Sequence, residues 1–240
     1  MASMDSVNQK FYRTTVHFEE LHRELRTYYE SKPSAFEPQD LSGEDGLRLV
    51  FREAKPVPAR IGLIAGDCIQ AMRSSLDYLV WELVLAHGKI QPGTRNAFPI
   101  ALTSEVYRKE LKRGRLEGVH PEAIASIDAL QPFLLSDQSR RDGAQLAILE
   151  ELANINKHRR VLLTGLGGFC GESDPLPLSY METHLDVTSA VGDHYRGRFI
   201  SFVSLKERKP TQGREIAGFI DTLASYVQNQ VFPLFKKFLE

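Results

Sequence analysis

The sequence has few cysteines and no long apolar run. Of its 240 residues two are cysteine, Cys68 and Cys170, and two thiols alone cannot complete a zinc site. We expect both to be reduced thiols in a reducing compartment. The first residues, MASMDSVNQKFYRTT, lack the apolar stretch of a secretory signal, and no segment reaches the roughly 18 apolar residues of a membrane span. We therefore expect a soluble, cytoplasmic protein without a membrane partner.

The sequence also lacks an excess of charge of either sign. Its 30 lysine and arginine residues face 31 aspartate and glutamate residues, which leaves a formal net charge of −1. Proteins that coat nucleic acid usually carry a basic excess, so nucleic acid is not the expected partner. The balance of apolar and charged residues is ordinary for a folded globular protein, and the length allows a sizeable core.

Apolar residues at helical spacing predict helices over most of the chain. The expected helices cover residues 5–30, 58–87, 104–112, 121–131, 142–163 and 212–239. Alternating residues predict two antiparallel hairpins: 35–41 with 46–56, and 179–191 with 197–207 across a turn at 192–197. Residues 89–100 and the glycine-rich residues 165–178 are expected to be loops. We therefore predict an α+β fold, mainly α: a single domain over residues 1–240, formed by a helical bundle with small inserted β-hairpins.

Two of the expected helices carry polar residues on their apolar faces. Each helical residue advances by about 100° around the axis. On this count Arg73 and Asp77 face the core from the helix at 58–87, and Asn156 and Arg159 face it from the helix at 142–163. A buried charge without a partner is costly, so these groups should be paired. We expect one shared network, in which Asp77 accepts hydrogen bonds from Arg159, Arg73 or both.

Two interpretations of this polar cluster are open. The network either fixes the register of the two helices, a known use of buried polar groups, or lines a functional cleft. Three residues are secondary candidates: Lys157 at the edge of the apolar face, His158 on the opposite side, and Tyr78 next to Asp77. Tyr78 and Trp81 either pack on a neighbouring helix or form an oligomer contact.

The segments MRSSLDYLVWEL and ELANINKHRRVL contain the residues of the cluster. They resemble a pair of helix motifs, L-R-x-x-L-D-H/Y and N-x-D/N-K-H-R, of an uncharacterised bacterial protein family. The resemblance implies membership of that family and no particular activity.

The helix around Arg73 is also remotely similar to the HEPN superfamily of helical ribonucleases and nucleotide-binding relatives. Its signature is an arginine, four to six further residues and then a histidine on a helix of a bundle, and it implies metal-independent RNA cleavage at a dimer interface. Arg73 would be that arginine, whereas Tyr78 occupies the place of the histidine. This departure removes the expected general acid or base, although His158 could approach from another helix.

The other polar residues do not combine into a standard metal or cofactor site. Glu19 and His22 have the i, i+3 spacing of di-iron bundles but lack the second motif that such bundles need. His184 and His194 fit no standard metal signature. We therefore expect no metal and no cofactor.

Two functions follow from these observations, and the question of enzymatic activity stays open between them. The first is a non-enzymatic binding or interaction module, organised around Arg73, Asp77, Asn156 and Arg159, for an unidentified ligand or protein partner. The alternative is a HEPN-like, metal-independent ribonuclease or nucleotide-binding protein. For either function we expect a homodimer, because helix-rich proteins often cover an exposed apolar helix face by two-fold pairing.

Overall fold

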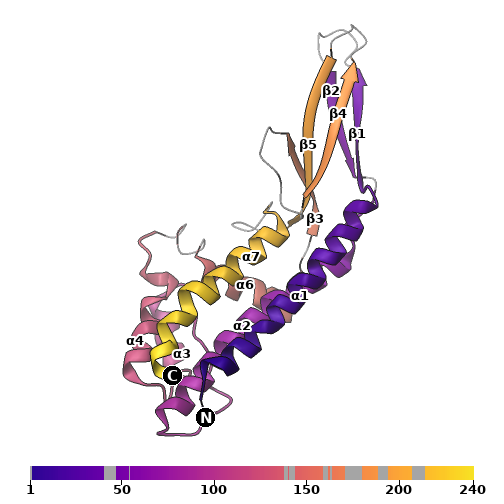
Figure 1. Ribbon diagram of the computed structural model, residues 1–240. Coiled ribbons are helices and arrows are strands. Elements are labelled where there is room, and N and C mark those ends of the chain that lie inside the picture. The colour runs from indigo at the N-terminus through magenta and orange to yellow at the C-terminus, as the bar shows by residue number, and fades with distance from the viewer. Residues whose placement is uncertain are drawn as a thin grey trace. The chain divides into compact units, whose positions relative to one another are not determined.

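The computed structural model divides into two compact units (Figure 1). The first unit comprises residues 1–18, 64–162 and 220–240, and the second comprises residues 19–63 and 163–219. The structure describes residues 2–40, 47–53, 55–137, 140, 144–158, 162, 164–170, 180–188, 194–206 and 214–240. The expectation of a single domain over residues 1–240 stays a prediction.

Helices predominate among the described residues, which confirms the mainly helical α+β fold class. The two longest are α1 (Met4–Glu30) and α2 (Ala59–His87). The others are α3 (Ser104–Lys112), α4 (Pro121–Ala129), α6 (Gln145–His158), α7 (Ile216–Tyr226) and α8 (Lys236–Leu239), with 3-10 turns at Pro132–Leu134 and Phe232–Phe235 and a π-helical turn at Val227–Val231. In the described part of the chain, no helix is long and apolar enough to cross a membrane.

Helix α2 provides much of the core of the first unit, as its low content of charge predicts. Its buried residues include Cys68, Ile69, Met72, Leu76, Leu79, Val80, Leu83 and Val84. The helix ends where Gly88 takes a φ of +69°, a left-handed conformation that favours glycine. The predicted end of this helix is therefore confirmed.

Side-chain contacts join the other helices of the first unit. The backbone N–H of Ser3 donates to Glu82 Oε2 of α2 (3.0 Å), and the rings of Phe11 and Phe232 meet edge to face with centroids 5.4 Å apart. His120 caps α4, because its Nδ1 accepts from the backbone N–H of Glu122 (3.2 Å). The ring of His120 also lies against that of His87 at the end of α2, so the cap is tied to the core helix.

The second unit contains two antiparallel sheets. β1 (Ser34–Asp40) pairs with β2 (Leu47–Glu53), as predicted. β3 (Thr164–Cys170), β5 (His194–Leu205) and β4 (Tyr180–Thr188) form a three-stranded sheet in that order. Tyr29 of α1 joins this sheet, because its hydroxyl oxygen accepts from the backbone N–H of Val203 (2.8 Å).

The strand β3 corrects the prediction of a loop at residues 165–170, whereas the rest of the predicted loop, 171–178, lies outside the described residues. Glycines favour loops in sequence patterns, but here residues 164–170 pair along β5, on the edge opposite β4. Gly165 serves close approach rather than a turn: a Cβ placed on it would lie 1.7 Å from Lys206 Cε. The predicted turn at 192–197 is also too long, because β5 begins at His194.

Several predicted helices are shorter than expected, and α4 ends at Ala129 rather than at residue 131. Helix α6 covers Gln145–His158; of the other residues in the predicted helix 142–163, Ala144 and Leu162 are described and neither is helical. The last helix, expected over residues 212–239, begins at Ile216, where Glu215 caps it by accepting from the N–H groups of Ala217 (2.8 Å) and Gly218 (2.6 Å). It then passes into the π-helical and 3-10 turns near Pro233, which has no N–H for a regular helical bond.

Candidate functional site

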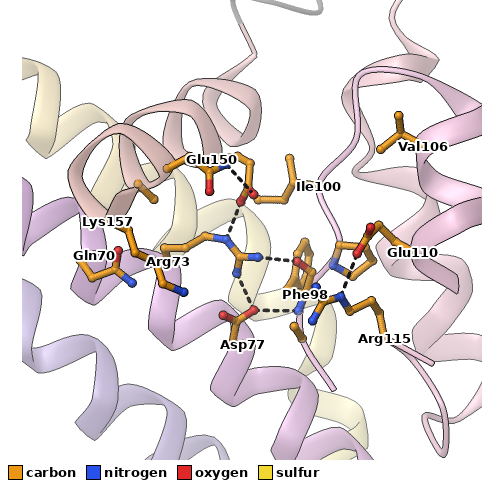
Figure 2. A pocket seen from close by; sticks show the side chains of 14 residues that line it. Gln70, Arg73, Asp77, Phe98, Ile100, Val106, Glu110, Arg115, Glu150 and Lys157 are labelled. Carbon is orange, nitrogen blue, oxygen red and sulfur yellow. Dashed lines mark hydrogen bonds and ion pairs between the residues drawn. The ribbon is translucent and has the colours of Figure 1, made fainter. Parts of the chain in front are cut away.

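A pocket of about 380 Å³ lies within the first unit, between α2, α6, the segment 97–100 and the end of α3 (Figure 2). Its lining contains three cationic residues (Arg73, Arg115 and Lys157) and three carboxylates (Asp77, Glu110 and Glu150). Pro99, Ile100 and Val106 add an apolar wall. The pocket therefore combines balanced charge with an apolar side.

Arg73 occupies the centre of this pocket, and all three of its nitrogen atoms donate to protein groups. Nε donates to Glu150 Oε2 (2.6 Å), Nη1 to Asp77 Oδ1 (2.5 Å), and Nη2 to the carbonyl oxygen of Phe98 (2.9 Å). The Arg73 side chain is 14% exposed, against 40% for Asp77 and 30% for Glu150. Burial lowers the pKa of Arg73, but Asp77 and Glu150 outweigh it, so the net pKa is raised and the group stays cationic.

Side chains hold the segment 97–101 on two sides. On the α2 side, Asp77 Oδ1 accepts a hydrogen bond from the backbone N–H of Phe98 (2.9 Å), and Arg73 donates to the carbonyl oxygen of Phe98. On the other side, the buried Gln131 accepts from the N–H of Ala101 (3.1 Å) and donates to the carbonyl oxygen of Pro99 (2.9 Å). The segment has no regular secondary structure, so these bonds replace a helix or sheet ladder.

A second ion-pair cluster lies at the α3 side of the pocket. Glu110 pairs with Arg115 (2.8 Å) and Arg113 (2.5 Å). Burial raises the pKa of Glu110, but the two guanidinium groups outweigh burial and the net pKa is lowered. Glu110 is therefore a paired carboxylate, and Arg115 is partly committed to it.

The structure brings together two of the four predicted cluster residues. Arg73 and Asp77 are in contact, whereas Asn156 lies against Gly66 of α2 and does not line the pocket. Arg159 lies outside the described residues, so a contact between Arg159 and Asp77 stays a prediction.

The secondary candidates are divided in the same way. Lys157 lines the pocket and is exposed. Tyr78 is exposed on α2 and is not part of the lining. His158 is the last residue of α6, and its side chain lies outside what the structure describes. Lys157 is thus the member of this group that joins the candidate site.

Sequence reasoning missed Glu150, the residue that links Arg73 to α6. A signal for it exists in the helix pattern: Glu150, Asn154 and Lys157 have i, i+4, i+7 spacing and share one face of α6. All three line the pocket, and Asn154 Nδ2 donates to Glu150 Oε1 (3.1 Å). The backbone of Phe98 was also missed, because a main-chain partner leaves no residue-type signal.

Two charged groups of the pocket, and the buried Oε1 of Gln70, have no bonding partner within the described part of the chain. Asp77 Oδ1 accepts two hydrogen bonds, but none is made to Oδ2, and the ammonium of Lys157 makes no ion pair. Among the residues that the structure describes, no group of three or more histidine, cysteine and acidic side chains could hold a metal. The free groups therefore offer one anionic and one cationic contact to a small molecule.

No family model, curated protein or solved structure was found to match the chain. The resemblances drawn from MRSSLDYLVWEL and ELANINKHRRVL stay predictions.

Replacement of Arg73 by methionine should destabilise the protein by about 3 kcal/mol, because Asp77 and Glu150 lose their shared cation. Both carboxylates are partly exposed to solvent, so the expected loss of stability is at the lower end of the range for breaking a buried ion pair. Asp77→Ala should cost less, about 1–2 kcal/mol, because Arg73 keeps Glu150 and the Phe98 carbonyl. Urea unfolding measures both, with Asp67→Ala on the exposed side of α2 as the control. An equal loss in the two variants would contradict this order.

The contact between Gly66 and Asn156 can be tested with a double-mutant cycle. A Cβ on Gly66 would lie 2.2 Å from Asn156 Oδ1, so Gly66→Ala should not gain the usual helix preference of alanine, about 1 kcal/mol. In an Asn156→Ala background the same change should stabilise the protein. A coupling free energy of at least about 1 kcal/mol between the two sites is expected. Additive effects would show that the two helices are farther apart.

Proposed function

We propose that the protein is a non-enzymatic binding module whose pocket beside Arg73 takes a small polar molecule. The observation that carries this proposal is the double anchoring of the segment 97–101, which gives the pocket a wall fixed by Arg73, Asp77 and Gln131. A preformed concave site with an apolar wall and a few polar groups is the usual form of a ligand site. Its volume of about 380 Å³ suits a small metabolite.

The same geometry weighs against the HEPN-like ribonuclease. RNA cleavage needs a positive group at the scissile phosphate together with a proton donor and acceptor. Arg73 has each of its nitrogen atoms bonded to protein oxygens, and two of these belong to carboxylates that would repel a phosphate. None of the described lining residues is a histidine. A phosphate at Arg73 would therefore have to approach two negative charges that already neutralise the guanidinium.

Purified protein should not cleave single-stranded RNA, with or without EDTA, because Arg73 is not available to a phosphate. The measurement is gel analysis of a labelled oligonucleotide over hours at micromolar protein. Cleavage that persists in EDTA and is lost in both Arg73→Ala and His158→Ala would overturn the binding-module proposal.

Binding itself is tested by thermal unfolding of the full chain in the presence of a panel of amino acids, carboxylates, amines, sugars and nucleotides. A molecule that binds the folded state raises the unfolding temperature, and the increase grows with its concentration relative to its Kd. Val106→Trp should abolish the increase, because Val106 is exposed at the pocket and the indole would fill it. Leu102→Trp, which is exposed outside the pocket, is the matched control. A stabilising molecule whose effect survives Val106→Trp would refute the assignment of this pocket.

A further inference from the structure

The pocket beside Arg73 is electrostatically divided. Arg73 carries one positive charge and contacts two carboxylates, so this centre has a net charge of about −1 at neutral pH. Lys157, on α6, supplies a positive charge that makes no ion pair among the described residues. In Figure 2, Lys157 and Gln70 lie to the left of the Arg73 guanidinium and Asp77 lies below it. A ligand that fits both regions carries a positive and a negative group of its own.

Specific atoms can receive these two groups. Asp77 is held by Arg73 and by the Phe98 N–H through one oxygen, Oδ1, which leaves Oδ2 to accept a hydrogen bond from an ammonium. The ammonium of Lys157 can donate to a carboxylate, and such charge-assisted bonds are stronger than neutral ones. Because Arg73 fixes Asp77 in place, the acceptor needs no rearrangement on binding.

The rest of the pocket limits the ligand's remaining part. Pro99, Ile100 and Val106 form the smaller, apolar part of a mostly polar lining, which can contact a short hydrocarbon group. The three cations and three carboxylates of the lining balance, so the pocket has no net positive charge to attract a polyanion such as a nucleoside phosphate. A ligand with only a positive group would leave Lys157 unpaired, and a ligand with only a negative group would leave Asp77 Oδ2 without a hydrogen-bond donor.

We propose that the ligand is a free α-amino acid with an apolar side chain, its ammonium bound by Asp77 and its carboxylate by Lys157. The proposal rests on the proposed binding function of the same pocket and specifies its ligand class. The side chain packs on the wall formed by Pro99, Ile100 and Val106. No covalent bond of the ligand is made or broken, so the ligand dissociates from the pocket chemically unchanged.

The experiment compares three molecules with the same branched hydrocarbon group: leucine, 4-methylpentanoate, which lacks the ammonium, and 3-methylbutylamine, which lacks the carboxylate. Titration calorimetry of the full chain should show leucine binding at least about 10-fold more tightly than either analogue, since each lost ionic contact is worth about one factor of ten. Lys157→Ala and Asp77→Asn should each weaken the binding of leucine by a similar factor. The amide introduced by Asp77→Asn keeps an oxygen for Arg73 and Phe98, so the wall stays in place.

The matched controls are Lys112→Ala and Asp67→Asn, which change the same charges at exposed positions outside the pocket and should leave leucine binding unaltered. Equal binding of leucine and one analogue would overturn the amino-acid assignment and leave the binding function standing. Suppose that leucine does not bind, and that a different molecule of the panel binds in a way that Val106→Trp abolishes. This result would also overturn the amino-acid assignment and leave the binding function standing. Leucine binding that persists in Lys157→Ala and Asp77→Asn would place the molecule elsewhere and also refute the inference.

Discussion

The guanidinium of Arg73 joins three segments that are distant in sequence: α2 itself, α6 through Glu150, and the segment 97–101 through Phe98. A buried cation of this kind is tolerated only when its donors are matched by acceptors of fixed geometry. Here two carboxylates and a carbonyl oxygen meet that need. The same side chain therefore contributes both to the position of α6 beside α2 and to the shape of the pocket wall.

The pocket wall shows how irregular backbone can be fixed without secondary structure. Buried N–H and C=O groups need partners, and most chains supply them from helices and sheets. In the segment 97–101 the partners are Arg73 and Asp77 from α2 and Gln131, which lies two residues after the end of α4. A loop anchored in this way combines the polar backbone that ligands contact with the rigidity that a binding site needs.

Much of the fold follows from local patterns in the sequence. The bounds of α3 and the end of α2 at Gly88 match the predictions, because capping residues and periodic apolar faces are local signals. The strand β3 does not match its prediction. Its glycines are explained by pairing with β5 and by the approach of Lys206, which are contacts between distant residues. Periodicity likewise shows that Arg73 and Asp77 face inward, but not that Glu150 faces them. The facing partner depends on how two helices are packed together, and helix periodicity does not encode it.

The hydrogen bond between the N–H of Phe98 and Asp77 can be followed through the hydrogen-exchange rate of the Phe98 amide. Amide protons in irregular segments normally exchange with solvent quickly, whereas this one is bonded at 2.9 Å to a carboxylate that Arg73 also holds, and the Phe98 side chain is fully buried. Its exchange requires the segment to separate from α2. The exchange rate at this one amide therefore measures how often the segment 97–101 separates from Asp77.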